Sequence, residues 1–347
     1  MNNKFKNYFF FILAAVLLPT IALTQNTVTF TNAAATGRYG PTQAQVTAAY
    51  DNTTLDDAVT ITTQGIQEWT VPATAVYTIE VYGARGGGAE GSNYGKGARM
   101  KGDFNLTADD VLKIVVGQMG GVQSSGSGGG GTFVVKKTGS GASDITALIV
   151  AGGGGGVYTS SSASYNEDAT TATSGLAASN NGAGGTNGGG GTGNTSSGAS
   201  GGGGLTGNGT SGSYGTYGES FTNGAEGGNH SSNSQCVGGF GGGGGTHGNT
   251  GGGAGGGGYS GGGGGNHGTN GGNGGGGGSY NGGSSQSNTA GTNDGHGQVV
   301  ITYCTGMCFA SIAKAADNSY VDVTFTAGAY NTNGGSGALE TSDFSLT

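Results

Sequence analysis

The sequence is short of charge and proline, and each shortage excludes a class of structure. Charged residues make up 9% of the 347 residues, and no Lys or Arg occurs from Thr138 through Ala313. A nucleic-acid-binding protein needs cations along its contact surface to neutralise phosphates, so we expect no nucleic-acid partner. All three prolines precede the glycine-rich region, which also lacks a Gly-X-Y period, so a collagen triple helix is excluded.

Cysteine is also scarce. The chain has Cys236, Cys304 and Cys308, which are too few for a disulfide-rich scaffold and allow one bridge with one thiol left over. We expect the disulfide Cys304–Cys308 first, although Cys236 could reach either of them in space. The odd cysteine and the strand-like residues 343–347, where the sequence stops, favour a fragment of a longer protein.

Long hydrophobic runs are missing except at the N-terminus. Residues 1–24 combine two lysines, an apolar stretch from Tyr8 to Leu18 and small residues up to Thr24, which is typical of a secretory signal peptide. The stretch is shorter than the roughly 20 residues that a membrane helix needs. We therefore expect an extracellular protein that is either released or attached to the cell surface. We expect no membrane-spanning segment in the mature chain.

Instead of long hydrophobic runs, the chain has short segments in which apolar and polar residues alternate. In Val76–Tyr82, for example, Tyr77, Ile79 and Val81 face one way and Thr78 the other. Similar segments separated by turn residues predict an all-β sandwich. The expected strands cover residues 68–71, 76–82, 99–106, 111–116, 132–136, 147–150 and 298–303.

The composition changes along the chain and divides it into four expected parts. We expect a signal peptide at 1–24, an N-terminal leader at 25–63 and a glycine-rich module at 64–304. The module has a β-core at 64–151 and 297–304 and a glycine-rich insertion at 152–296. Residues 305–347 resemble the start of a truncated Ig-like β-sandwich domain. The leader contains short β-like pieces and a short helix with Pro41 at its start.

The insertion contains most of the 86 glycines. Glycine and serine without a strict period usually form flexible chain. The ordered alternative is an extended threefold helix, in which glycine lets neighbouring helices pack without Cβ atoms and pair their backbone groups. As one such helix, Gly251–Gly265 would be about 45 Å long. The runs Gly241–Gly245, Gly261–Gly265 and Gly274–Gly278 would lie beside it, with turns at 246–250 and 266–270.

Several motifs occur together in a set order between residues 64 and 303. They are Gln67-Glu-Trp-Thr-Val-Pro72, Tyr77-Thr-Ile-Glu-Val-Tyr-Gly-Ala84, Leu112-Lys-Ile-Val-Val-Gly-Gln118, Gly129-Gly-Gly-Thr-Phe-Val134, Leu148-Ile-Val-Ala-Gly-Gly-Gly154 and Gly256-Gly-Gly-Tyr-Ser-Gly-Gly262. This segment resembles the glycine-rich domain in the extracellular part of anaplastic lymphoma kinase and leukocyte tyrosine kinase receptors, and in many bacterial secreted and surface proteins. The resemblance implies a jelly-roll core of the tumour-necrosis-factor type with an inserted bundle of poly-glycine helices. In the receptors the domain takes part in recognising a protein ligand, but no ligand-contact motif is matched here.

Motifs that carry chemistry are weak. Gly-x-Ser-x-Gly occurs around Ser200 and Ser260. A hydrolase nucleophile in this motif is followed by a helix, but no helix pattern follows either serine. His247 and His267 share a similar Gly, Asn and Thr setting, so a two-histidine metal site is the alternative to two polar turns. Nearby acidic residues are scarce, and polar turns are favoured. We expect no catalytic site, no cofactor and no metal site, and we expect Trp69 to lie in the core.

Together these features predict a structural and recognition module of a secreted or surface-attached bacterial protein. The first hypothesis is adhesin-like binding of a protein or glycan by a jelly-roll core and its poly-glycine bundle. One alternative is an ice- or crystal-surface-binding protein, because such bundles can present flat arrays. The other is a non-catalytic targeting part of a larger secreted enzyme.

Overall fold

The computed structural model describes residues 25–88, 94–158, 166–179, 182–230, 236–248, 251–267, 272–304, 309–314 and 321–325, the last two by their backbone alone. The expected signal peptide and most of the expected C-terminal domain lie outside these residues and stay predictions. Within the described ranges, no helix is long and apolar enough to cross a membrane.

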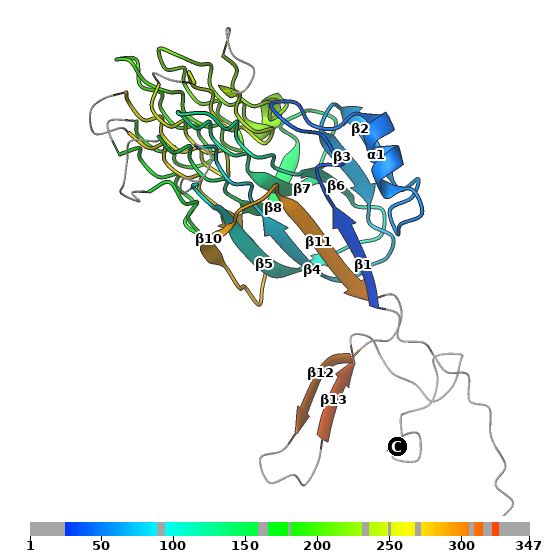
Figure 1. The fold of residues 1–347 in the computed structure, drawn as a ribbon. Helices are drawn as coiled ribbons and strands as arrows, with labels where there is room; N and C mark the ends of the chain where they lie inside the picture. The colour runs from blue at the N-terminus through cyan, green and yellow to red at the C-terminus, as the bar shows by residue number, and fades with distance from the viewer. Residues whose placement is uncertain are drawn as a thin grey trace, which may run out of the picture.

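The secondary structure is almost entirely β (Figure 1). One α-helix and one short 3-10 turn accompany the strands of the described chain. The elements are β1 (Gln25–Phe30), α1 (Gln43–Tyr50), β2 (Val59–Thr63), β3 (Ile66–Thr70), β4 (Ala75–Tyr82), β5 (Gly97–Leu106), β6 (Val111–Val115), β7 (Thr132–Lys137), β8 (Ile145–Ala151), η1 (Phe221–Asn223), β9 (Tyr280–Asn281), β10 (Thr289–Asn293), β11 (Gln298–Cys304), β12 (Phe309–Lys314) and β13 (Val321–Phe325).

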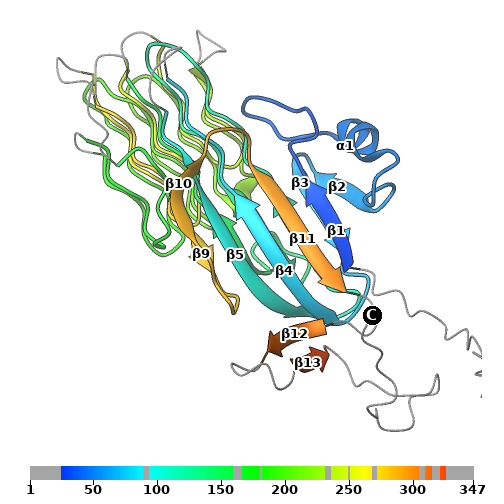
Figure 2. The ribbon, with the colours of Figure 1, turned by 60° about the horizontal axis from the view of Figure 1, so that its bottom comes forward.

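The strands form two antiparallel sheets packed face to face. Sheet A has the order β1-β11-β4-β5-β10, and sheet B has the order β2-β3-β6-β7-β8-β9. The chain passes between the sheets at β1 to β2, β3 to β4, β5 to β6 and β9 to β10. Figure 2 looks onto sheet A, where β11 lies between β1 and β4. These sheets confirm the predicted all-β sandwich. A separate antiparallel pair, β12 and β13, follows.

The space between the sheets is filled by the residues that the alternating pattern points inward. Tyr77, Ile79 and Val81 of β4 are fully buried there, together with Leu112 and Ile114 of β6. The aromatic rings form a cluster at one end of this core, with centroid separations of 4.8–6.3 Å. Its members are Phe30, Tyr50, Trp69, Tyr77 and Tyr303, so Trp69 lies in the core as expected.

The segment 25–63 contributes to both sheets, because β1 pairs with β11 and β2 pairs with β3. The helix α1 begins at Gln43 rather than at Pro41, since the side chain of Thr42 caps it in a capping box with Gln45. Pro41 therefore precedes the cap. Tyr50 on the last turn of α1 donates a 2.6 Å hydrogen bond to Oε1 of buried Gln67, which ties the helix to β3.

A second hydrophobic cluster covers the outer face of sheet B. Phe133 on β7 packs against Phe221 of the insertion, with ring centroids 5.4 Å apart. Phe240 is 1% exposed and lies against Gly40 and Gly65, where an added Cβ would come closer than 3.0 Å to its ring. Phe221 and Phe240 are therefore anchors that hold the glycine-rich insertion to sheet B.

Candidate recognition surfaces

The glycine segments continue directly from the strands of the sandwich. Segment 83–88 follows β4, segment 152–157 follows β8, and residues 117–131 connect β6 to β7. Figure 1 shows these segments running side by side beyond one end of the two sheets. We call residues 83–88, 117–131, 152–158 and the described part of 166–279 the glycine bundle. Its distal end is the end away from the strands.

Backbone hydrogen bonds in the bundle repeat every third residue. Successive N–H groups of residues 253–258 donate in turn to three parallel neighbours. Residues 253 and 256 donate to segment 272–275, residues 254 and 257 to segment 126–129, and residues 255 and 258 to segment 200–203, with N–O distances of 2.8–3.2 Å. Each segment thus offers its donors in three directions, unlike a β-strand, which offers them in two.

The carbonyl groups of the same segment point to three further neighbours. Those of residues 253 and 256 accept from segment 262–265, those of residues 254 and 257 accept from segment 153–156, and that of residue 255 accepts from Gly244, with N–O distances of 2.7–2.8 Å. Segment 253–258 therefore has six hydrogen-bonded neighbours. The backbone groups in the middle of the bundle are paired although they are buried, which removes the main cost of burying them.

Glycine is needed in this segment for space. A Cβ added at Gly253, Gly255 or Gly256 would come closer than 3.0 Å to a backbone carbonyl of a neighbouring segment. None of the three has a positive φ, so conformational freedom is not the reason for glycine. Ala254 in the same segment is fully buried, and its Cβ is accommodated.

We expected the run Gly251–Gly265 to form one straight segment, and this prediction is wrong. The chain bends at residues 258–260 and returns antiparallel, so that Gly262 donates to the carbonyl of Gly256 at 2.8 Å. The physical reason is Tyr259 at the bend, whose ring stacks on Tyr280 at 4.9 Å in the second cluster. The runs Gly241–Gly245, Gly261–Gly265 and Gly274–Gly278 do lie beside residues 253–257 as predicted.

The four histidines lie at three places. His230 and His247 meet edge to face near the distal end, with ring centroids 4.8 Å apart. His267 instead contacts Tyr158, with ring centroids 5.9 Å apart. His296 accepts a hydrogen bond at Nδ1 from the backbone of Met119. Among the described residues, no three metal-ligating side chains gather at one place.

The two serines of the Gly-x-Ser-x-Gly matches are structural. Ser200 and Ser260 are both fully buried. Their Oγ atoms accept hydrogen bonds from the backbone N–H groups of Gly212 and Gly188, at 3.0 and 3.2 Å. Neither hydroxyl is open to a substrate, and each supports a glycine segment instead.

Cys236 is a free, fully buried cysteine, so it forms no bridge with Cys304. Burial raises the pKa of its thiol to about 11, which keeps the thiol protonated and unreactive. Cys308 lies outside the described residues, and the Cys304–Cys308 disulfide stays a prediction.

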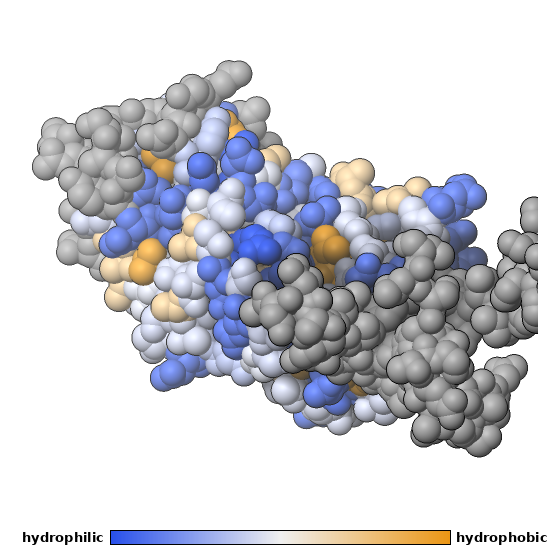
Figure 3. All heavy atoms as spheres, turned by 90° about the horizontal axis from the view of Figure 1, so that it is seen from below, coloured by the Kyte–Doolittle hydropathy of each residue, from blue (hydrophilic) through white to orange (hydrophobic). Residues whose placement is uncertain are grey.

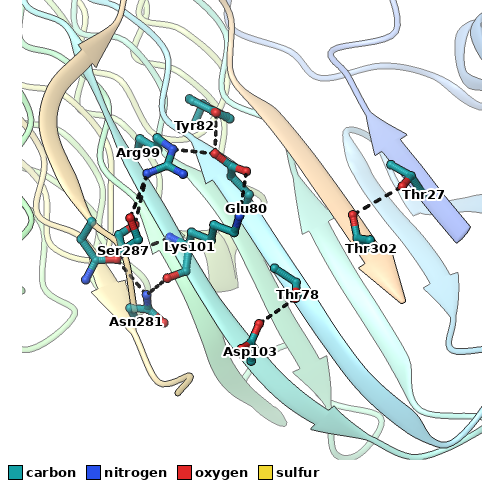
Figure 4. Close-up of polar contacts among 11 residues, drawn as sticks. Thr27, Thr78, Glu80, Tyr82, Arg99, Lys101, Asp103, Asn281, Ser287 and Thr302 are labelled. Atoms are coloured by element: carbon teal, nitrogen blue, oxygen red, sulfur yellow. Dashed lines mark hydrogen bonds and ion pairs between the residues drawn. The ribbon is translucent and has the colours of Figure 1, made fainter. Parts of the chain in front are cut away.

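The second candidate surface is the outer face of sheet A, shown from below in Figure 3 as a largely hydrophilic surface with isolated hydrophobic residues. Its polar side chains lie in rows across the strands. One row contains Thr27, Thr302, Thr78 and Asp103, which pair in register from β1 through β11 and β4 to β5. Figure 4 shows that Thr78 donates to Asp103, at 2.7 Å.

The charges on this face neutralise one another. Glu80 forms ion pairs with Arg99 and Lys101 and accepts a hydrogen bond from Tyr82 (Figure 4). Burial alone would raise the pKa of Glu80, but the hydrogen bonds from Tyr82 and Arg99 and the two cations outweigh it, so its pKa is lowered. Arg99 also donates to Ser287. The charged side chains of this face are thus paired with neighbours on the same face.

The sequence matches no protein-family model. It is similar to the leukocyte tyrosine kinase receptor of Mus musculus, with 34% identity over 109 residues. That match covers 30% of this chain and 12% of the receptor, so the chain spans a small part of the receptor's length. The similarity agrees in part with the resemblance found in the sequence motifs.

Proposed function

We propose that this chain is a non-catalytic recognition module of an extracellular bacterial protein, with adhesin-like binding of a protein or glycan. In this proposal the sandwich holds a rigid bundle of poly-glycine helices, and the distal end and flat faces of that bundle contact the partner. The observation that carries it is the six-neighbour hydrogen bonding of residues 253–258, which makes the bundle a packed element and a fixed surface. The similarity to a receptor supports an extracellular location and a binding role.

Two features support the finer description of the fold. A repeat of three residues in the direction of the N–H groups is the period of the extended threefold helix. The four crossings between sheets, and the return of β11 to a position between β1 and β4, support a core of the jelly-roll type.

The bundle is a better candidate than the outer face of sheet A. On that face Glu80, Arg99 and Lys101 are paired with one another, so a partner would have to compete with existing ion pairs. At the distal end, Tyr214 is only partly buried, and an aromatic side chain of this kind is a common anchor in binding sites. The burial of Ser200 and Ser260 supports a non-catalytic role.

The test is binding of the purified, fluorescently labelled chain to a glycan array and to immobilised collagen, fibronectin and fibrinogen. We expect binding to at least one probe, a loss of at least tenfold in affinity for Tyr214→Ala, and little change for the matched control Lys101→Ala. Circular dichroism of both variants checks that they fold. Binding that survives Tyr214→Ala but not Lys101→Ala would move the site to sheet A. Binding to none of these probes would argue against an adhesin-like role.

A further inference from the structure

Two histidines from different segments of the bundle meet near its distal end. His230 follows the segment 227–229, and His247 follows the run 241–245. The distal position follows from Ser125, in the middle of the β6–β7 connection, whose N–H donates to the carbonyl of Gly248 at 2.9 Å. The two rings are nearly perpendicular, with an interplanar angle of 86°, and Tyr214 lies 5.7 Å from His247 between ring centroids.

The backbone beside both histidines is fixed before any ligand binds. The carbonyl of Asn229, the residue before His230, accepts from the N–H of Thr216 at 2.7 Å. The carbonyl of Thr216 accepts in turn from Gly245 at 3.1 Å. Thr246, the residue before His247, donates to the carbonyl of Cys236 at 3.2 Å. The backbone positions from which the two rings project are therefore set by the packing of three neighbouring segments.

The separation of the rings suits a shared metal ion. With a metal–nitrogen distance of about 2.1 Å, an imidazole centroid lies about 3.2 Å from the metal, and two rings at about 100° have centroids about 5 Å apart. The observed separation is 4.8 Å.

We propose that His230 and His247 form a two-histidine site for a divalent transition metal, of the kind that imidazole prefers: Cu²⁺, Ni²⁺ or Zn²⁺. Among the described residues, no third histidine, cysteine or carboxylate joins the pair, so the proposal assigns two protein ligands to the ion. A bound ion would staple segment 227–230 to segment 241–247. Its remaining positions would be open to an imidazole or carboxylate of another molecule. This site does not depend on the proposed recognition function.

The test is titration calorimetry of the full, untagged chain with NiCl₂ at pH 7.5. We expect one ion per chain, and a dissociation constant at least tenfold higher in each of His230→Gln and His247→Gln. The matched control is His267→Gln, because His267 has a similar Asn, Gly and Thr setting but lies beside Tyr158. That variant should bind as the unchanged chain does. Thermal denaturation of all three without metal checks that they fold.

Electron paramagnetic resonance of the Cu²⁺-loaded chain gives an independent readout. The spectrum should show two equivalent nitrogen ligands in the unchanged chain and one in His230→Gln. Absence of Ni²⁺ binding, equal affinity in all variants, or an equal loss in His267→Gln would each overturn the proposal. Two nitrogen ligands that persist in His230→Gln would overturn it as well, because the rings would then only pack against each other.

Discussion

Replacing Gly256 by alanine should destabilise the protein strongly, although the change adds a single methyl group. The new Cβ would come closer than 3.0 Å to backbone atoms of Gly153 and Gly154, and backbone cannot move aside as a flexible side chain can. Overpacking of this kind costs roughly 1–3 kcal/mol. The hydrogen bonds of Gly256 to Gly275 and from Gly262, at 2.9 and 2.8 Å, would also be strained.

Each strained hydrogen bond costs about 1 kcal/mol more, and the lower entropy of an unfolded alanine returns roughly 0.4–1 kcal/mol. The expected loss of unfolding free energy is therefore about 2–5 kcal/mol. For a domain of this size it corresponds to a fall in Tm on the order of 3–9 °C. Differential scanning calorimetry and urea unfolding measure both quantities.

Two matched controls come from the same chain. Gly295→Ala adds a Cβ whose nearest neighbour atom would be Oδ1 of Asn293 at 3.9 Å, so its effect should stay within about 0.5 kcal/mol. Ala254→Gly removes a buried methyl group from the segment that contains Gly256, without adding a clash, and should cost about 1 kcal/mol. If Gly256→Ala were as stable as Gly295→Ala, the close packing of the segments would be refuted.

Three further predictions concern the anchors and the pH response. Phe240→Ala should lower the unfolding free energy by about 3–5 kcal/mol in urea, because the ring is buried against sheet B; a loss under 1 kcal/mol would contradict this role. A double-mutant cycle on Arg38 and Glu226, whose 2.9 Å ion pair is partly exposed, should give no more than about 1 kcal/mol. Burial lowers the pKa of both His230 and His296, so both bind protons more readily when unfolded; stability should fall as pH drops below 6.5, and a Tm unchanged between pH 7.5 and 5.5 would oppose it.

The sandwich could be predicted from local pattern. In β4 the alternation of Tyr77, Ile79 and Val81 with polar residues gave both the strand and its buried face, and the structure buries all three. Strands β9 and β10 could not be found in this way. β9 is two residues long, and β10 reads Thr-Ala-Gly-Thr-Asn, so neither has a hydrophobic period, and both join the sheets only because of tertiary pairing.

The arrangement of the bundle was less predictable than its composition. A glycine run carries no side-chain period, so nothing in Gly251–Gly265 marks which residues face which neighbour. The bend at Tyr259 depends on a partner, Tyr280, that is distant in sequence. The pairing of His230 with His247, rather than of His247 with His267, likewise depends on which segments become neighbours.

Amide hydrogen exchange across residues 253–258 tests the central claim most directly. All six N–H groups donate to neighbouring segments, so they should exchange only through large opening events, with protection close to that of Ile79 and Val81 in β4. The measurement is made by NMR or by mass spectrometry of peptides that cover the run. Exchange at the rate of an unstructured glycine peptide would contradict the packed bundle, and with it the proposal that its surface recognises a partner.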